Sequence, residues 1–304
     1  MGELSANFVD LTKFICEKIE KAVGFVFDPY GLKNESRKQL ISRIKSENLP
    51  PLEEAALISR VNKIIKEYIN QNDILQIALD DINSQQKPET PKFDSVDDEF
   101  LSRFFDSAKH VSSEEFKLIW GRILANELKN PNSISKRLIQ ILSIIEPHQA
   151  KIFTEICKYS FFYEGKYIPF IDFSNSPSYW AYQNITLDTL LNLQSIGLIT
   201  LSSDDYKMQL EGASPTETSP FFQGEFVYFN YLISLLLKKD KMTDEKKVVV
   251  RFGNVMFTDA GAELFKVIDT KYSDDVLSHI LIYLYSQGFS IMKNKFFDDP
   301  DEIR

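Results

Sequence analysis

The sequence predicts a mostly α-helical protein with a smaller α+β part. Apolar residues recur at helical spacing through the first half of the chain, and closely spaced helix stops and starts over residues 97–160 indicate several short, packed helices. Beyond Tyr159 the pattern changes to short apolar runs of strand length that alternate with single helices, which is typical of an α+β region.

Composition limits the classes of protein that the chain can belong to. Its 304 residues exceed the usual size of a single core, so we expect more than one domain. A net charge of −9 argues against a surface that wraps nucleic acid as a whole. Cys16 and Cys157 are predicted to be buried free thiols, with a disulfide as the minor alternative. The start of the chain lacks a basic, apolar leader and no run of 18 apolar residues occurs, so we expect a cytoplasmic protein.

The N-terminal region, residues 1–83, is predicted to be helical. Residues 8–27 place apolar side chains on one face, which indicates either a helix packed on its own domain or an amphipathic segment that docks on a membrane or a partner. Residues 52–83 give a second, longer helical pattern, and the polar residues 70–73 are expected to break it in two. The proline-containing residues 84–96 are the predicted linker.

Residues 97–160 are predicted to form a central bundle of three or four helices. Ser112 with Glu115 predicts a capping box, in which a side-chain oxygen of each residue accepts from a free amide of the other. Pro147 suits the first position of the last helix, since its missing amide hydrogen would have no helical partner.

Residues 161–304 are predicted to form a winged-helix-like C-terminal domain. Thr186 caps a helix that stops at Gly197 and leads into a strand. The dipeptide 253–254, Gly-Asn, lies between two apolar runs and predicts a hairpin turn. A helix capped by Thr258 follows, so the order of helix, hairpin and helix is that of winged-helix modules.

The central region contains the pattern Trp-x-x-Ile-Leu-Ala-x-Glu-x-x-x-Pro, made by Trp120, Ile123, Leu124, Ala125, Glu127 and Pro131, with Ser133 and Ser135 after it. This pattern resembles that of an uncharacterised bacterial family known only as a domain of unknown function. A similar helix occurs in a family linked to abortive infection, so the resemblance implies a role in bacterial defence against phage. The chain departs from the pattern at Asn132 and at residues 136–138, and we expect the fold to survive that change.

The residues of this motif are interpreted mainly as core and helix-terminating residues. Trp120 and Leu124 lie one turn apart and are expected to face the core. Arg122, Glu127 and Arg137 are the candidates for contact with a ligand or a partner, because a guanidinium can bind a phosphate or a carboxylate in bidentate fashion.

The inventory of catalytic groups is small. The three histidines are isolated in the sequence: His110, His148 and His279. The sequence contains no histidine or cysteine pattern with zinc-ligand spacing. It also lacks a glycine-rich phosphate loop and a nucleophile elbow. We therefore predict no catalytic residue, no metal and no cofactor, and no small-molecule ligand is evident. Glu164, Lys166 and Asp172 are the best candidates for a magnesium-dependent nuclease, although a loop salt bridge is the favoured interpretation of the first two.

Residues 238–251 form a locally basic segment. It contains Lys238, Lys239, Lys241, Lys246, Lys247 and Arg251. Six positive and three negative side chains give it a charge of +3, and a wing at this place could contact phosphate. The helix over residues 187–196 carries Asp188 and neither lysine nor arginine, which disfavours reading of a DNA major groove.

The sequence therefore predicts a non-catalytic sensor, regulator or effector subunit of an anti-phage defence system. It is expected to act through protein contacts, with a protein partner or a second copy of itself. Three alternatives stay open: a nucleic-acid-binding regulator, a metal-dependent nuclease, and a toxic effector that reaches a membrane through residues 8–27.

Overall fold

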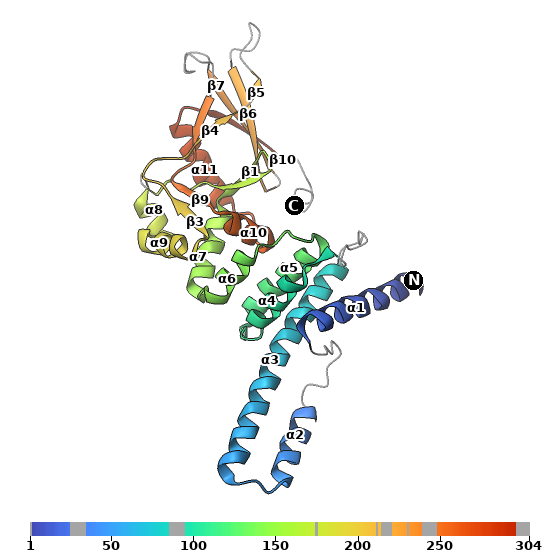
Figure 1. The fold of residues 1–304 in the computed structure, drawn as a ribbon. Coiled ribbons are helices and arrows are strands. Elements are labelled where there is room, and N and C mark those ends of the chain that lie inside the picture. The colour runs from blue at the N-terminus through green and yellow to red at the C-terminus, as the bar shows by residue number, and fades with distance from the viewer. Residues whose placement is uncertain are drawn as a thin grey trace. The chain divides into compact units, whose positions relative to one another are not determined.

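A computed structural model describes residues 2–24, 35–84, 95–173, 176–210, 212–213, 221–229, 231–238 and 248–295. Over these residues it contains eleven helices and ten strands (Figure 1). The chain forms two compact units, residues 1–143 (unit 1) and 144–304 (unit 2). The predicted class, mostly α with a smaller α+β part, is confirmed. The finer division at residues 84, 97 and 161 stays a prediction.

In unit 1 every element of regular secondary structure among the described residues is a helix. Its helices are α1 (Gly2–Val23), α2 (Glu35–Ser46), α3 (Pro51–Ser84), α4 (Asp98–Ala108), α5 (Glu114–Lys129) and α6 (Lys136–Ile144). The inner half of α3 packs along α5, and α1 packs on α4. Gly121 permits the close approach of α3 and α5, since a Cβ atom at this position would lie 2.4 Å from Ile77 Cγ2. Phe104 meets Trp120 edge to face, with ring centroids 5.0 Å apart, and both are fully buried as predicted for Trp120.

The predicted break at residues 70–73 is wrong, because α3 continues through them as one helix of 34 residues. Asn70 Nδ2 donates to Lys109 O at 2.9 Å, and Gln71 Nε2 donates to Phe105 O at 2.8 Å. These carbonyls lie at the end of α4, where carbonyls can accept from outside the helix, and Phe105 O also accepts from Lys109 N at 3.2 Å. A polar run that would interrupt an isolated helix is therefore used here to fasten two helices together.

Asn72 differs from its two neighbours, because its buried amide oxygen and nitrogen have no hydrogen-bond partner among the described residues. A buried polar group without a partner costs on the order of 1–3 kcal/mol, and alanine also has the higher helix propensity. We expect Asn72→Ala to raise the free energy of unfolding by about 1–2 kcal/mol in urea titrations. Gln71→Ala is the matched control and should lower it, since it removes the buried hydrogen bond that Gln71 donates to the Phe105 carbonyl. A loss of stability in Asn72→Ala would contradict the expectation.

The capping box predicted for Ser112 and Glu115 is wrong. Helix α5 begins one residue later than that pairing requires, with Ser113 as its N-cap and without a side-chain cap bond. A capping box forms instead at the start of α7, where the Glu146 amide donates to Gln149 Oε1 at 2.9 Å. Pro147 occupies the first turn of that helix, as predicted.

Unit 2 combines helices with antiparallel strands. Its elements are α7 (Pro147–Lys158), β1 (Ser160–Tyr163), β2 (Lys166–Pro169), α8 (Pro177–Tyr182), α9 (Leu187–Ile196), β3 (Ile199–Leu201), β4 (Lys207–Leu210), β5 (Gly212–Ala213), β6 (Phe221–Tyr228), β7 (Tyr231–Lys238), β8 (Val248–Arg251), β9 (Val255–Phe257), α10 (Asp259–Val267), α11 (Asp274–Ser286) and β10 (Ser290–Lys295). The largest sheet has the order β10-β7-β6-β1-β2, with β5 also on β6. Two further pairs are β3 with β9 and β4 with β8.

Strands β6 and β7 form a hairpin in which Phe226 lies opposite Ile233. Both side chains are buried, which agrees with the prediction of a buried element in this apolar stretch. Phe161 of β1 packs on Phe226 at a centroid distance of 4.8 Å and on Phe252 at 6.1 Å. None of the described helices is long and apolar enough to cross a membrane.

The hairpin predicted at residues 253–254 is wrong, since β8 pairs with β4 whereas β9 pairs with β3. Gly253 has a φ of 99° and forms a parallel bridge with Ile171. The dipeptide serves a close approach of two backbones instead of a turn between adjacent strands. The predicted caps Thr186 and Thr258 are confirmed, because their hydroxyls accept from Thr189 N at 3.3 Å and from Gly261 N at 3.1 Å.

Candidate functional site

Glu127, singled out by the motif, lies near the end of α5 and is only 1% exposed. Its carboxylate accepts hydrogen bonds from Asn132 N at 2.6 Å, from Ile134 N at 3.0 Å and from Ser133 Oγ at 3.4 Å. Burial raises the pKa of Glu127, although these hydrogen bonds act in the opposite direction. The loop between α5 and α6 is thus folded around one carboxylate, which accounts for the spacing from Glu127 to Ser133.

Arg122 and Arg137, the other candidates from this region, have different surroundings. Arg122 is half-buried within α5, whereas Arg137 is exposed in the first turn of α6. Lys136, next to Arg137, pairs with Asp97 at 3.2 Å and with Glu99 at 2.7 Å. Contact of Arg122, Glu127 or Arg137 with a ligand or partner remains a prediction.

The basic segment falls largely outside the described residues. This holds for Lys239, Lys241, Lys246 and Lys247. Lys238 ends β7 and pairs in register with Phe221. Arg251 is exposed at the end of β8, and its main chain is held by Gln287, which accepts from the Arg251 amide at 2.9 Å and donates to its carbonyl at 2.8 Å. A phosphate contact by this segment remains a prediction.

The nuclease candidates are divided between the surface and the core. Glu164 and Lys166 are exposed at the turn between β1 and β2, where Glu164 and Gly165 both have positive φ. Two such residues are what a tight hairpin turn needs. Asp172 is buried, and its backbone carbonyl accepts from Trp180 Nε1 at 2.8 Å. Among the described residues, no three His, Cys, Asp or Glu side chains are placed to hold a metal ion.

Unit 2 contains an aromatic cluster that was not predicted from the sequence. The His279 ring stacks on Tyr179 at a centroid distance of 3.6 Å, with the planes 2° apart, and Trp180 meets it edge to face. Tyr159 Oη and Tyr179 Oη are 3.0 Å apart. Burial lowers the pKa of His279, which the charge of Asp172 partly opposes. The cluster joins α7, α8 and α11, and its members lie too far apart in sequence to give a local signal.

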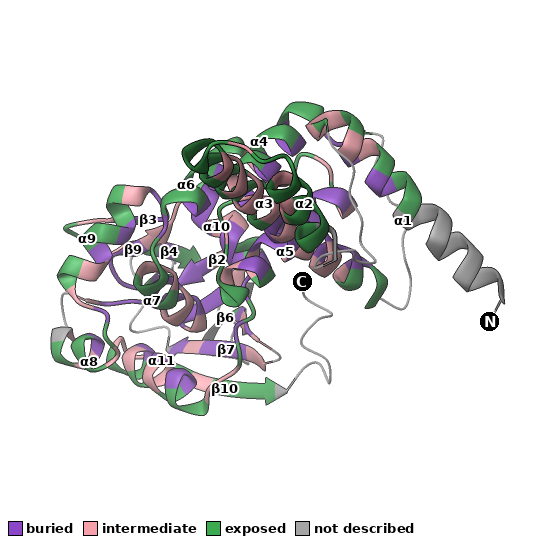
Figure 2. Cartoon of the chain, turned by 90° about the horizontal axis from the view of Figure 1, so that it is seen from below, coloured by how far each residue is buried: buried purple, intermediate pink, exposed green. Residues whose placement is uncertain are grey.

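The most unusual surface lies on the antiparallel pair formed by α2 and the outer half of α3, residues 35–69, which we call the arm (Figure 1). From residue 37 to residue 69 no side chain is buried, and Figure 2 shows α2 coloured largely as exposed. Twelve large apolar side chains occur within this stretch: Leu40, Ile41, Ile44, Leu49, Leu52, Leu57, Ile58, Val61, Ile64, Ile65, Tyr68 and Ile69.

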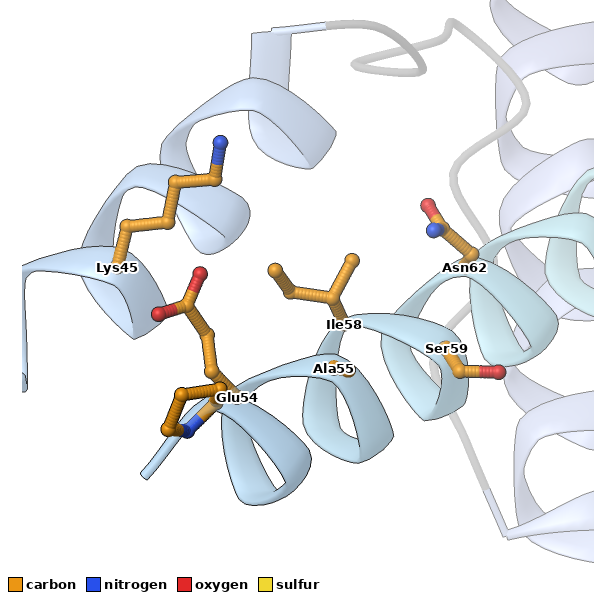
Figure 3. A pocket seen from close by; sticks show the side chains of 7 residues that line it. Lys45, Glu54, Ala55, Ile58, Ser59 and Asn62 are labelled. Carbon is orange, nitrogen blue, oxygen red and sulfur yellow. The ribbon is translucent and has the colours of Figure 1, made fainter. Parts of the chain in front are cut away.

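The two helices of the arm enclose an open groove of about 630 Å³ (Figure 3). It is lined by Lys45, Pro51, Glu54, Ala55, Ile58, Ser59 and Asn62. Arg37 Nε donates to Asn62 Oδ1 at 3.0 Å, which fixes α2 on this side of α3. The groove therefore combines an apolar floor with one cation and one carboxylate at its rim.

Comparison with known proteins places the chain in a family. Residues 58–280 match the family model described as a protein of unknown function, DUF2806. The chain belongs to the DUF2806 family. Neither the curated proteins nor the solved structures contain a match to it.

The DUF2806 match begins inside α3, so it includes the motif around Trp120 and the greater part of unit 2. Helix α2 and residues 51–57 of α3 lie before it. The groove of this DUF2806 protein is therefore built from α3 residues before and after residue 58, where the family match begins, together with Lys45 of α2.

Proposed function

We propose that this DUF2806 protein is a non-catalytic regulator or effector subunit of bacterial defence against phage, and that it acts through protein contacts. The observation that carries the proposal is the arm, in which twelve large apolar side chains remain unburied over residues 37–69. The defence setting rests on the resemblance of the motif between Trp120 and Pro131 to abortive-infection proteins.

Physical chemistry supports a partner for the arm. Most of the stability of a protein helix comes from packing of its apolar face, and isolated short helices are marginal in water. Full burial of one Val, Leu, Ile or Phe side chain contributes about 1.5–3 kcal/mol. A partner that covers even some of these side chains would therefore gain enough free energy for stable association.

Unit 2 also favours protein contacts over DNA contacts. We infer a winged-helix-like arrangement from the order of α8, α9, β3, β9 and α10, in which α9 takes the place of the recognition helix. The exposed side chains of α9 include Leu187, Asp188 and Leu191, and this helix contains neither lysine nor arginine. Such a surface suits an apolar protein partner better than a phosphate backbone.

The proposal is tested by plaque assays in a bacterial host that carries the gene together with its natural neighbours. Wild-type protein is expected to lower the number of plaques, and Ile64→Arg is expected to restore it to the number seen without the gene. Ile64 is 54% exposed, so its replacement should leave the fold intact while placing a charge on the apolar face.

Leu52→Arg is the matched control, because Leu52 is 84% exposed on the same helix, lies about 120° around that helix from Ile64, and the change in charge is identical. It should protect like wild type. The proposal fails if the wild-type gene gives no protection against any phage, or if Ile64→Arg protects as well as Leu52→Arg does.

A further inference from the structure

Helix α3 carries a stripe of residues from Leu57 to Ile82 that is apolar except at Gln71. Residues spaced four and three apart form it: Leu57, Val61, Ile64, Tyr68, Gln71, Leu75, Ala78 and Ile82. This is the spacing at which a helix presents a continuous seam to another helix. The inner four side chains are buried within unit 1, whereas none of the outer four is buried. The seam therefore continues beyond the core that covers its first half.

Helix α2 occupies a neighbouring side of α3. It faces Ala55, Ile58 and Asn62, and Figure 3 shows Ile58 directed toward the space below α2. Leu57 and Val61 each lie one residue from a member of that set, which is about 100° around the helix. The outer half of the seam therefore lies next to the side of α3 that α2 covers, and α2 does not bury it. Ile64 is its most exposed member.

The charge of the arm is compatible with association between two copies of the chain. Residues 35–69 contain seven basic and five acidic side chains, a net charge of +2, so the other residues together carry −11. Two chains of net charge −9 repel one another over most of their surfaces. The arm carries a net charge of only +2 and side chains of both signs, so two arms repel one another less than the remaining surfaces do.

The rim of the groove is also self-complementary. Lys45 ends α2 and Glu54 begins α3, so both lie at the tip of the arm. A two-fold axis along the arm would place α2 of one copy antiparallel to α3 of the other, which repeats the pairing already present within each arm. Lys45 of each copy would then approach Glu54 of the other.

We propose that the arm is a dimerisation element, and that a second copy of this chain covers the seam formed by Leu57, Val61, Ile64 and Tyr68 in a four-helix packing. The inference rests on the proposed function, since it names the protein that contacts the arm. It requires neither a ligand nor a covalent step.

Sedimentation equilibrium of the full chain across a dilution series tests this directly. Wild type is expected to have twice the monomer mass of 35.2 kDa. Ile64→Arg should weaken the dimer at least about 30-fold, because the new charge would be buried where the second copy packs on the seam, and Leu52→Arg should associate like wild type. A monomeric wild type, or a dimer that survives Ile64→Arg, would overturn the inference.

Cysteine cross-linking gives a second readout that does not depend on a destabilising change. Ile64→Cys is expected to be joined between copies by a bismaleimide reagent long enough to reach from one α3 to the other, and Leu52→Cys is not, whereas the native Cys16 and Cys157 are buried. Equal cross-linking of the two variants would contradict the proposed seam.

If wild type is monomeric and Ile64→Arg still abolishes protection against phage, the dimer fails while the proposed function stands. If wild type dimerises through the seam and Ile64→Arg protects normally, the proposed function fails instead.

Discussion

Gly253→Ala is expected to lower the free energy of unfolding of unit 2 by more than about 4 kcal/mol. A Cβ atom at this position would lie 1.8 Å from Ile171 O and 2.6 Å from Asp172 N, where main-chain atoms leave no room. The φ of 99° adds strain for any residue other than glycine. Moving the Ile171 carbonyl away would break its hydrogen bond from Asn254 N, now 3.0 Å long.

Gly165→Ala is the matched control for this substitution. Gly165 also has a positive φ, 77°, but a Cβ atom there would meet no other atom within 4 Å. It should cost only the strain of the left-handed conformation, about 1–2 kcal/mol. Urea titrations combined with thiol labelling would separate the units, because Cys157 lies in unit 2 and Cys16 in unit 1, and both are buried. Equal losses in the two alanine variants would show that the close approach to Ile171 is unimportant.

Several features set by neighbouring residues could be predicted from the sequence, although the capping box expected for Ser112 and Glu115 was wrong. Thr186 and Thr258 cap helices, and Pro147 begins one, because a hydroxyl or a missing amide hydrogen acts within a single turn. The predictions at residues 70–73 and 253–254 failed for the opposite reason. There the outcome depends on the end of α4 and on Ile171, which the local pattern does not specify.

The candidate functional residues likewise depend partly on local sequence and partly on contacts with distant residues. The motif identified Glu127, yet its three donors come from the following loop, and only the folded chain shows that they converge on one carboxylate. His279 was isolated in the sequence and stacks on Tyr179, a hundred residues earlier. Helical periodicity on either side of residues 70–73 could be read from the sequence, but the continuity of α3 through them could not. Whether its outer half is buried depends on where α4 and α5 end, and this determines the exposed surface of the arm.

Glu127→Ala is the second substitution with a large expected effect, a loss of about 3 kcal/mol from the stability of unit 1. It removes the acceptor for the amides of Asn132 and Ile134, whose bonds to a carboxylate are stronger than neutral ones. Urea titrations would measure the loss, and amide hydrogen exchange at Asn132 and Ile134 should accelerate. Glu115→Ala, an exposed position in the first turn of the same helix, should cost less than about 1 kcal/mol.

The pH dependence of unfolding provides an independent test of the same carboxylate. Burial raises the pKa of Glu127 in the folded chain, so the native state holds this proton more tightly than the unfolded state does. Its contribution to stability is therefore present at low pH, and it is lost as pH rises from the ordinary glutamate value of about 4.3 through the folded value. Glu127→Gln cannot titrate and should remove this part of the decline, while costing about 1–2 kcal/mol for the acceptor it loses. An unchanged pH profile in Glu127→Gln would assign the titration to another group.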